Sequence, residues 1–438
     1  MFFSFLCYNY FSEGGQLMQL RILDYDEVQE ELNRITKDNG FEKQESIKTK
    51  CDNLEVPYYT LGHGDSNIIV MGGTHGSEII SVDFVLRLME DLSKKKGEFQ
   101  NFNIDDYTFH FIPVQNPEGY IVSTSAIRTL IPKDASEEEI EKISKEYFLA
   151  YRQDDINAKN NPDDKSLKNH QKMFENVTYE CIPDKYPKLK ESIKEIYANP
   201  KVPKGSIIVH RGNGLGEETN RSLLFRSLLN DSDSIYGPNR YNNIDTTIPG
   251  PLGTAPVHEN IPENKFLIDL IDKLYKEGKY CGMLSYHGTG GMIYSKVSHD
   301  DEKLVDFDLP EEYMRKKYRN SVINSMLSKK YHNDTIYTTP NGSEKPGYRI
   351  VQDPSLKDFD ERLRLDYPAV LLIELSYMGG NPIGPLGDKD NNYVPTMEAN
   401  LKAASNYFKY CKFLKNTMYD KVIVFDDEVS DEYATKTI

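Results

Sequence analysis

A short apolar run that ends abruptly in polar groups constrains this chain more than any other feature. Residues 68–71, Ile-Ile-Val-Met, lead into two glycines, and His75 and Glu78 follow within the same turn. From residue 82 to residue 89, apolar side chains then recur at helical spacing. A buried strand, a glycine turn and a helix make the first unit of an α/β sheet, so we expect this segment to lie in such a sheet.

Four further apolar runs end in the same way, each at a turn that carries polar side chains. They end at Asn116 after "YTFHFIPVQ", at His210 and Arg211 after "GSIIV", at His287 in "YCGMLSYH" and at Glu374 in "PAVLLIELS". In open α/β sheets, binding sites form just outside the carboxyl ends of the strands. We therefore expect all five runs to be strands and their polar ends to share one crevice.

Other segments differ in character from these runs. Residues 25–36 predict an amphipathic helix. Residues 133–204 are dense in Lys, Glu, Asp and Asn and contain two Glu/Lys-rich helical patterns, so we expect a charged helical insertion on the surface. We expect residues 1–17 to be a disordered extension, residues 18–424 to form a single domain, and residues 425–438 to be a frayed acidic tail.

The composition argues against two classes of partner. The formal net charge of −16 is opposite in sign to a surface that binds nucleic acid or anionic membranes. No apolar run reaches the roughly 18 residues of a transmembrane helix, and the first 20 residues lack the basic residues of a signal peptide. The five scattered cysteines suit reduced thiols, so we expect a cytoplasmic protein. No feature indicates an oligomeric state.

Two imidazoles and a carboxylate among the polar ends suggest a metal site. His75, Glu78 and His287 match the ligand set of hydrolytic zinc sites, which keep a fourth position open. The spacing of His75 and Glu78 lets both reach one ion from a tight turn, and the third ligand arrives from a distant strand. Zinc held in this way polarises a carbonyl group and lowers the pKa of its bound water to about 7. An H-x-x-E pair alone is more often an ordinary surface pair, so the prediction needs all three residues.

Glu374 lies inside the apolar sequence "VLLIELS", where a carboxylate is costly to bury. Such a group usually has a partner or a role in a site. A carboxylate that faces a zinc ion can take the proton of an attacking water. We therefore predict that Glu374 is a general base.

Together these motifs resemble the zinc metallocarboxypeptidases of the carboxypeptidase A type. "GGTHGSE" is similar to the family's G-G-x-H-x-x-E, "IPVQNPEGY" to its N-P-D-G-Y turn, "SYHGTGG" to its third-ligand strand and "LLIELS" to its catalytic-glutamate strand. The order is that of the family, over roughly residues 55 to 390. The resemblance implies a zinc carboxypeptidase-like domain, an α/β fold whose mixed, twisted sheet has about eight strands and helices on both faces.

The resemblance also implies roles for individual residues. His75, Glu78 and His287 would bind one zinc ion, and Glu374 would be the general base and acid. The family's substrate segment runs R-x-N and then G-x-D-x-N-R, and here "HRGNGLGEETNR" has Glu in place of Asp. The sites implied by that segment are Arg211 for the tetrahedral intermediate and Asn220 with Arg221 for the terminal carboxylate of the substrate. A forked guanidinium group suits both tasks.

The substrate side leaves alternatives open. The segment continues with Ser where the family usually repeats Asn. Other placements for the carboxylate-binding residues are Arg152 and the pair Asn239 and Arg240. The family's mobile tyrosine is assigned to Tyr348, with Tyr337 as the second choice. The sequence does not indicate which C-terminal side chain is preferred.

The combined prediction is a zinc-dependent hydrolase that acts on a peptide with a free C-terminal carboxylate and releases its last residue. One alternative is a related zinc amidase or deacylase that acts on acyl amino acids or cell-wall peptides, with the same metal site and base. Another is a catalytically inactive member that binds peptides. The presence of all three ligand types together with Glu374 disfavours the inactive member.

Overall fold

A computed structural model of the chain describes most of the predicted domain. The described residues are 21–147, 172–200, 202, 205–217, 219–220, 261–288, 292–294, 349–350, 370–375 and 393–419. The expected extension at residues 1–17 and the expected tail at residues 425–438 lie outside them, and the domain boundaries stay a prediction. No helix in the described part has both the length and the apolar character that crossing a membrane requires.

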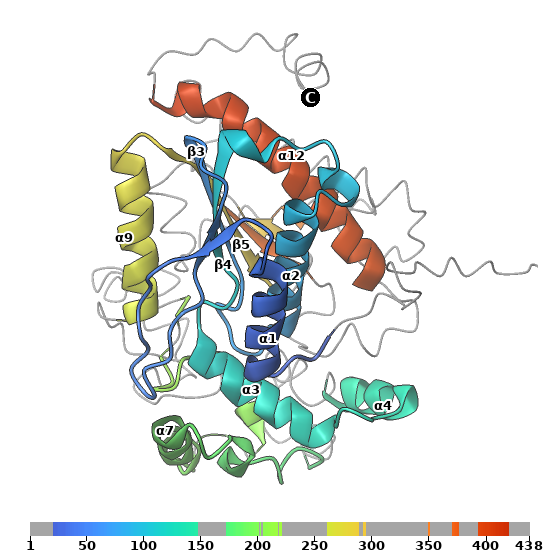
Figure 1. The fold of residues 1–438 in the computed structure, drawn as a ribbon. Helices are drawn as coiled ribbons and strands as arrows, with labels where there is room; N and C mark the ends of the chain where they lie inside the picture. Colours follow the sequence, from blue (N-terminus) through green and yellow to red (C-terminus); the bar gives the residue numbers. More distant parts are fainter. Residues whose placement is uncertain are drawn as a thin grey trace, which may run out of the picture.

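A mixed sheet of eight described strands forms the centre of the fold (Figure 1). In sheet order the strands are β1 (Phe41–Lys43), β2 (Tyr59–Leu61), β4 (Tyr107–Ile112), β3 (Ser66–Met71), β5 (Tyr280–His287), β8 (Val370–Glu374), β6 (Met292–Tyr294) and β7 (Arg349–Ile350). The central strands β4, β3, β5 and β8 are parallel to one another. Antiparallel pairs flank them on both sides, β2 against β4 and β6 against β8. The predicted mixed sheet is confirmed.

Helices cover both faces of the sheet. One face carries α1 (Tyr25–Thr36), α2 (Ile79–Ser93) and α12 (Tyr393–Tyr419), and the other carries α9 (Pro262–Lys276) (Figure 1). In β3, Ile68 and Val70 pack into the hydrophobic cluster that contains residues of α1, α2 and α12. Ile69 and Met71 pack with the apolar side of α9. A strand buried on both sides is apolar throughout, which explains the run at residues 68–71. The predicted two-sided packing is confirmed.

Three further helices lie at the carboxyl end of the central strands (Figure 1). They are α3 (Pro117–Leu130), α4 (Glu137–Tyr147) and α7 (Pro187–Tyr197). The described short 3-10 helices are η1 (Gly97–Phe99), η2 (Ile104–Asp106), η4 (Tyr179–Cys181) and η5 (Ser206–Val209). Both helical patterns of the charged segment form helices, α4 and α7. In α7 the apolar side chains Leu189, Ile193 and Ile196 are buried, so one face of this helix packs on the domain.

One of the five predicted strands is wrong. Residues 206–209 form the 3-10 helix η5, which follows Gly205 at a φ of 75°. The amide of His210 closes the turn by donating to the carbonyl of Ile207 at 3.1 Å. All four residues of η5 are buried. A run of four apolar residues cannot distinguish a buried strand from a buried helical turn, which is why the sequence misled here.

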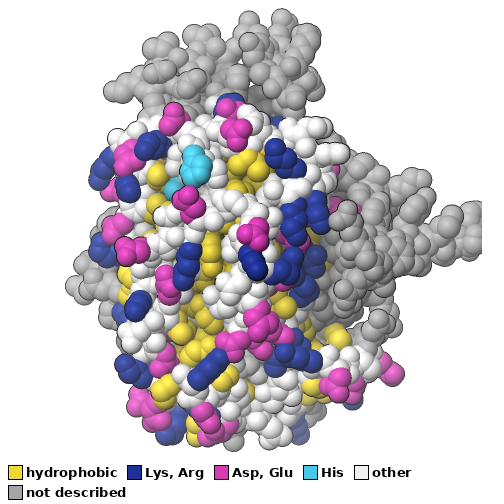
Figure 2. All heavy atoms as spheres, viewed as in Figure 1, with side chains coloured by type: hydrophobic (Ala, Val, Ile, Leu, Met, Phe, Trp, Pro, Cys, Tyr) yellow, Lys and Arg dark blue, Asp and Glu magenta, His cyan; other side chains and the backbone are white. Residues whose placement is uncertain are grey.

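Basic and acidic side chains are interspersed on the face seen in Figure 2. Oppositely charged side chains also form ion pairs in the described part of the chain, such as Arg34 with Glu31 and with Glu90 at 2.7 Å each. Exposed pairs of this kind contribute little to stability. The described residues of this face thus present a mixed surface and not the basic stripe typical of nucleic-acid binding.

Candidate active site

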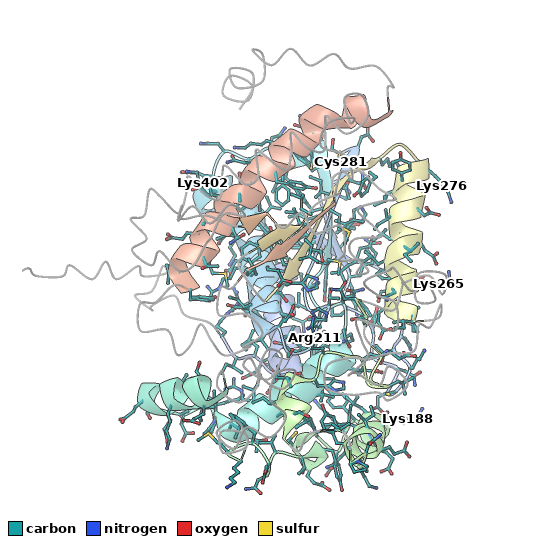
Figure 3. All side chains as sticks on the ribbon, turned by 180° about the vertical axis from the view of Figure 1, so that it is seen from behind. Lys188, Arg211, Lys265, Lys276, Cys281 and Lys402 are labelled. Atoms are coloured by element: carbon teal, nitrogen blue, oxygen red, sulfur yellow. The ribbon has the colours of Figure 1, made fainter. Side chains whose placement is uncertain are left out.

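The carboxyl ends of β3, β4, β5 and β8 meet at one edge of the sheet because these strands are parallel. The polar residues at or just beyond these ends are His75 and Glu78 after β3, Asn116 after β4, His287 in β5 and Glu374 in β8. Figure 3 shows Arg211 just beyond the same ends, next to α3. The polar residues that the sequence placed together therefore lie at one edge of the sheet.

Glycines shape the turn that carries His75 and Glu78. Gly73 has a φ of 64°, in the left-handed region that other residues rarely adopt. Gly76 packs directly on the backbone of Gly119, and a Cβ atom at Gly76 would lie 2.1 Å from the carbonyl oxygen of Gly119. Any larger residue at position 76 would push the turn away from α3. Gly73 and Gly76 are therefore needed to bring the imidazole of His75 and the carboxylate of Glu78 to the same point.

His75, Glu78 and His287 meet in a buried cluster. Nδ1 of His75 lies 2.8 Å from Oε1 of Glu78, and Nδ1 of His287 lies 3.1 Å from Oε2 of Glu78. The two Nδ1 atoms are 3.3 Å apart, and one ligand atom of each residue lies within 4.8 Å of the other two. Ligands at 2.0–2.1 Å from a tetrahedral zinc ion are about 3.4 Å apart, so the three residues fit a zinc ion.

Glu78 is held as a carboxylate in this cluster. Burial alone raises the pKa of its carboxyl group, but the imidazoles of His75 and His287 outweigh burial and hold that pKa well below its usual range. The backbone amide of Gly288 also donates to Oε2 of Glu78 at 3.0 Å. The ionised form is the one that binds a metal ion.

Arg211 reaches the same cluster from the loop after η5. Its Nη2 atom lies 3.0 Å from Nε2 and 3.1 Å from Nδ1 of His75, and 4.0 Å from Oε1 of Glu78. The side chain is 27% exposed, so it borders both the buried cluster and solvent. The backbone of Arg211 is fixed as well, because the amide of Gly76 donates to its carbonyl at 3.4 Å. A positive charge is thus available beside the candidate metal ligands.

Glu374 lies beside His287 in the neighbouring strand. The two residues are paired in the register between β5 and β8, and the amide of Leu375 donates to the carbonyl of His287 at 3.0 Å. Paired residues on adjacent parallel strands point to the same face of a sheet. Glu374 therefore shares its face of the sheet with a candidate metal ligand, and its catalytic role stays a prediction.

The structure describes only part of the predicted substrate side. Asn220 is 2% exposed and follows Thr219, whose hydroxyl donates to the carbonyl of Thr74 at 2.7 Å. Asn220 thus lies one residue from a contact with the turn that carries His75. The other predicted substrate residues and their alternatives lie outside the described residues, namely Arg221, Tyr348, Tyr337, Arg152, Asn239 and Arg240.

Asn116 has a structural role that the sequence reveals only in part. Its side-chain oxygen accepts from the amide of Gly119 at 2.9 Å and caps α3. Its Nδ2 donates to the carbonyls of Gly212 at 3.0 Å and of Arg211 and Thr74 at 3.3 Å. One amide thereby joins the β3 turn to the Arg211 loop. Asn before Pro at a helix start signals the cap, but nothing local signals the other contacts.

The carboxyl group of Glu263, in the first turn of α9, should make the stability of the fold depend on pH. Its side chain is fully buried, and neither oxygen has a hydrogen-bond partner among the residues that the structure describes. Burial, helped by the charges of Glu118 and Glu217, raises the pKa of Glu263 from 4.5 to about 8. The folded state therefore binds this proton more tightly than the unfolded state, and stability falls as the pH rises from 4.5 to 8, by about 1.4 kcal/mol per pH unit at most.

We expect Glu263→Gln to be more stable than the wild type, by a margin that grows with pH over this window. Urea unfolding at pH 5, 6.5 and 8 measures the margin. Glu195→Gln on the exposed side of α7 is the control and should show no such trend. A margin that is the same at all three pH values would contradict the buried, protonated carboxyl group.

Comparisons with known proteins give one family and several solved structures. The family model of zinc carboxypeptidases matches residues 38–177, about a third of the chain. Bovine thrombin-activatable fibrinolysis inhibitor, solved with tick carboxypeptidase inhibitor, is 12% identical, with 88% of this chain and 95% of that chain covered and a TM-score of 0.48. Carboxypeptidase A from Helicoverpa armigera is 13% identical, with coverages of 89% and 75% and a TM-score of 0.45. No curated protein matches the sequence.

The matched segment contains His75, Glu78 and Asn116 but ends before Arg211, His287 and Glu374. The family model therefore supports the first half of the site directly. The second half rests on the geometry that brings His287 and Arg211 to the first two ligands. The resemblance to the zinc carboxypeptidases is thus confirmed by the family model over residues 38–177.

Proposed function

We propose that the protein is a zinc-dependent metallocarboxypeptidase that releases the C-terminal residue of a peptide. The observation that supports this best is the buried meeting of His75, Glu78 and His287, with the guanidinium group of Arg211 against them. Two imidazoles, a carboxylate and an adjacent fixed cation are what a hydrolase needs to activate a carbonyl group. The family match over residues 38–177 supports the same conclusion.

His75, Glu78 and His287 would hold one zinc ion. Bound there, zinc supplies a Lewis acid for the scissile carbonyl and makes water a stronger acid. The Gly288 amide steadies Glu78 by donating to the oxygen that also faces His287. Outer contacts of this kind orient metal ligands and tune them.

Glu374 would move the protons of the reaction. Its carboxylate takes a proton from the attacking water and later returns it to the leaving amine. Its pairing with His287 in the sheet supports this role, because both residues point to the same face. No other glutamate or aspartate belongs to the described strands at this edge of the sheet.

Arg211 and the residues after it would bind the substrate. The guanidinium group of Arg211 stabilises the negative charge that develops on the carbonyl oxygen. Asn220 and Arg221 bind the free terminal carboxylate, and Tyr348 closes over it. The contact of Thr219 with the turn that carries His75 supports a carboxylate site close to the metal.

The test compares peptides that differ only at their C-terminus. The full chain, loaded with one equivalent of zinc, should release the last residue of free-acid peptides. It should act on the matching C-terminal amides with a kcat/KM at least about 10²-fold lower, because the carboxylate-binding residues would lose their charged partner. A zinc chelator should abolish the activity, and added zinc should restore it. Equal rates on both peptides, or activity on acyl amino acids or cell-wall peptides alone, would favour the amidase instead.

A further inference from the structure

Four buried residues, one of them next to His75 in the sequence, form a closed ring of hydrogen bonds through their side chains and two backbone carbonyls. The hydroxyl of Thr74 donates to Oε1 of Gln115 at 2.7 Å, and Nε2 of Gln115 donates to Oδ1 of Asn264 at 3.0 Å. Nδ2 of Asn264 then donates to the carbonyl of Thr219 at 2.7 Å. The hydroxyl of Thr219 donates to the carbonyl of Thr74 at 2.7 Å, which closes the ring. Each donor meets an acceptor all the way round.

The ring joins four segments that are far apart in the sequence. Thr74 belongs to the turn after β3, Gln115 to the turn before α3, Thr219 to the loop after η5, and Asn264 to the first turn of α9. Two ring members are direct neighbours of proposed site residues, since Thr74 precedes His75 and Thr219 precedes Asn220. The ring thus lies between a candidate metal ligand and a candidate substrate-binding residue.

All four ring members are almost inaccessible to solvent, at 1% exposure or less. A buried amide or hydroxyl that loses its partner cannot turn to bulk water instead. Removal of one member therefore takes one hydrogen bond from each of its two neighbours in the ring, and the effect spreads around the ring. Such a network acts as a unit, and this makes it suited to holding two loops in a fixed relation.

We propose that Gln115 and Asn264 are positioning residues that hold the turn bearing His75 in register with the loop bearing Asn220. The proposal rests on the proposed function for its consequence in catalysis, but the ring itself does not depend on it. Neither amide is a candidate ligand or base. They act through Thr74 and Thr219, and so set the distance between the turn of the candidate metal ligand His75 and the loop that would bind the substrate's terminal carboxylate. Misplacement by about 1 Å can cost a factor of about 10² in rate.

The decisive variant is Asn264→Leu, which keeps the number and branching of the side-chain heavy atoms and removes both hydrogen bonds of the amide in the ring. Its matched control is Asn400→Leu in α12, on the other face of the sheet. Asn400 is also fully buried, and its Nδ2 donates to the carbonyl of Thr396 at 2.8 Å, within its own helix. Both variants replace a buried amide by an isosteric apolar group, so the general cost of that exchange is matched.

Amide hydrogen exchange on the zinc-free protein tests the ring without any assay of activity. We expect Asn264→Leu to speed exchange by about 10-fold or more in residues 74–76 and in residues 219–220 together, although neither segment is altered. Asn400→Leu should leave both segments unchanged. If exchange rises only next to position 264, or equally in both variants, the two loops are not coupled through the ring and the proposal is wrong.

Kinetics with the zinc-loaded protein test the consequence for the site. Asn264→Leu should raise KM for free-acid peptides by about 10-fold or more, keep one zinc per chain, and reduce the preference for free acids over amides. Thr219→Val should have the same effect, and the double variant should be little worse than either single variant. An unchanged KM in an active Asn264→Leu protein would overturn the positioning role. If the wild type cleaves no peptide, the proposed function fails, and the exchange experiment alone decides whether the loops are coupled.

Discussion

Glu374→Gln should lower kcat/KM for free-acid peptides by about 10²- to 10⁴-fold, the range that general acid–base catalysis contributes. Glutamine has the shape of glutamate, but its amide cannot accept the proton of the attacking water. The metal should stay, because none of the three candidate ligands is changed. Steady-state kinetics with a free-acid peptide, together with zinc analysis of the same samples, measure both quantities.

The control for this variant is Glu195→Gln, an equally conservative exchange on the exposed side of α7, which should keep full activity. The comparison separates the loss of a base from the loss of one negative charge on a chain of net charge −16. Activity in Glu374→Gln equal to that of the wild type, with zinc bound in both, would rule out Glu374 as the base. Its pairing with His287 would then be only a structural feature of the sheet.

The metal centre could be predicted because its parts are local or follow from strand direction. His75 and Glu78 lie in one glycine turn, and a strand buried on both faces is evident from its unbroken apolar sequence. His287 joins them from 209 residues farther along the chain, since parallel strands end at the same edge of a sheet. The helix at residues 25–36 could be predicted equally well, because its apolar residues repeat at helical spacing. The structure has α1 at the same residues.

The hydrogen bonds that join the loops around the site could not be predicted, because they connect residues far apart in the sequence. The hydrogen bond between Gln115 and Asn264 joins residues that are 149 positions apart. The sequence around each of them does not indicate that its amide is buried. Glu263 likewise follows an ordinary Pro at the start of a helix, a place where acidic residues are common and usually exposed. Only the packing of α9 against the loops makes its carboxyl group unusual. Local patterns thus identify what a strand end carries, but not what holds it in place.

His287→Ala should remove zinc from the protein and with it all peptide hydrolysis. Loss of an outer partner of a ligand alone weakens metal binding by about 10- to 100-fold, and loss of a ligand should exceed that. Because zinc would bind the folded state and not the unfolded state, it should also stabilise the fold, by about 4 kcal/mol at a free concentration 1,000-fold above Kd. Zinc should therefore raise the Tm of the wild type and leave that of His287→Ala unchanged.

Comparing each protein with and without zinc is the essential step, because His287 is fully buried and its removal leaves a cavity that lowers the Tm by itself. The difference between the two Tm values of one protein contains no contribution from that cavity. His63→Ala, at a histidine whose side chain is 79% exposed and which lies before the amino end of β3, should show the same zinc-dependent rise as the wild type. If zinc raised the Tm of His287→Ala by as much as that of the wild type, zinc would bind elsewhere. His75, Glu78 and His287 would then not form the metal site.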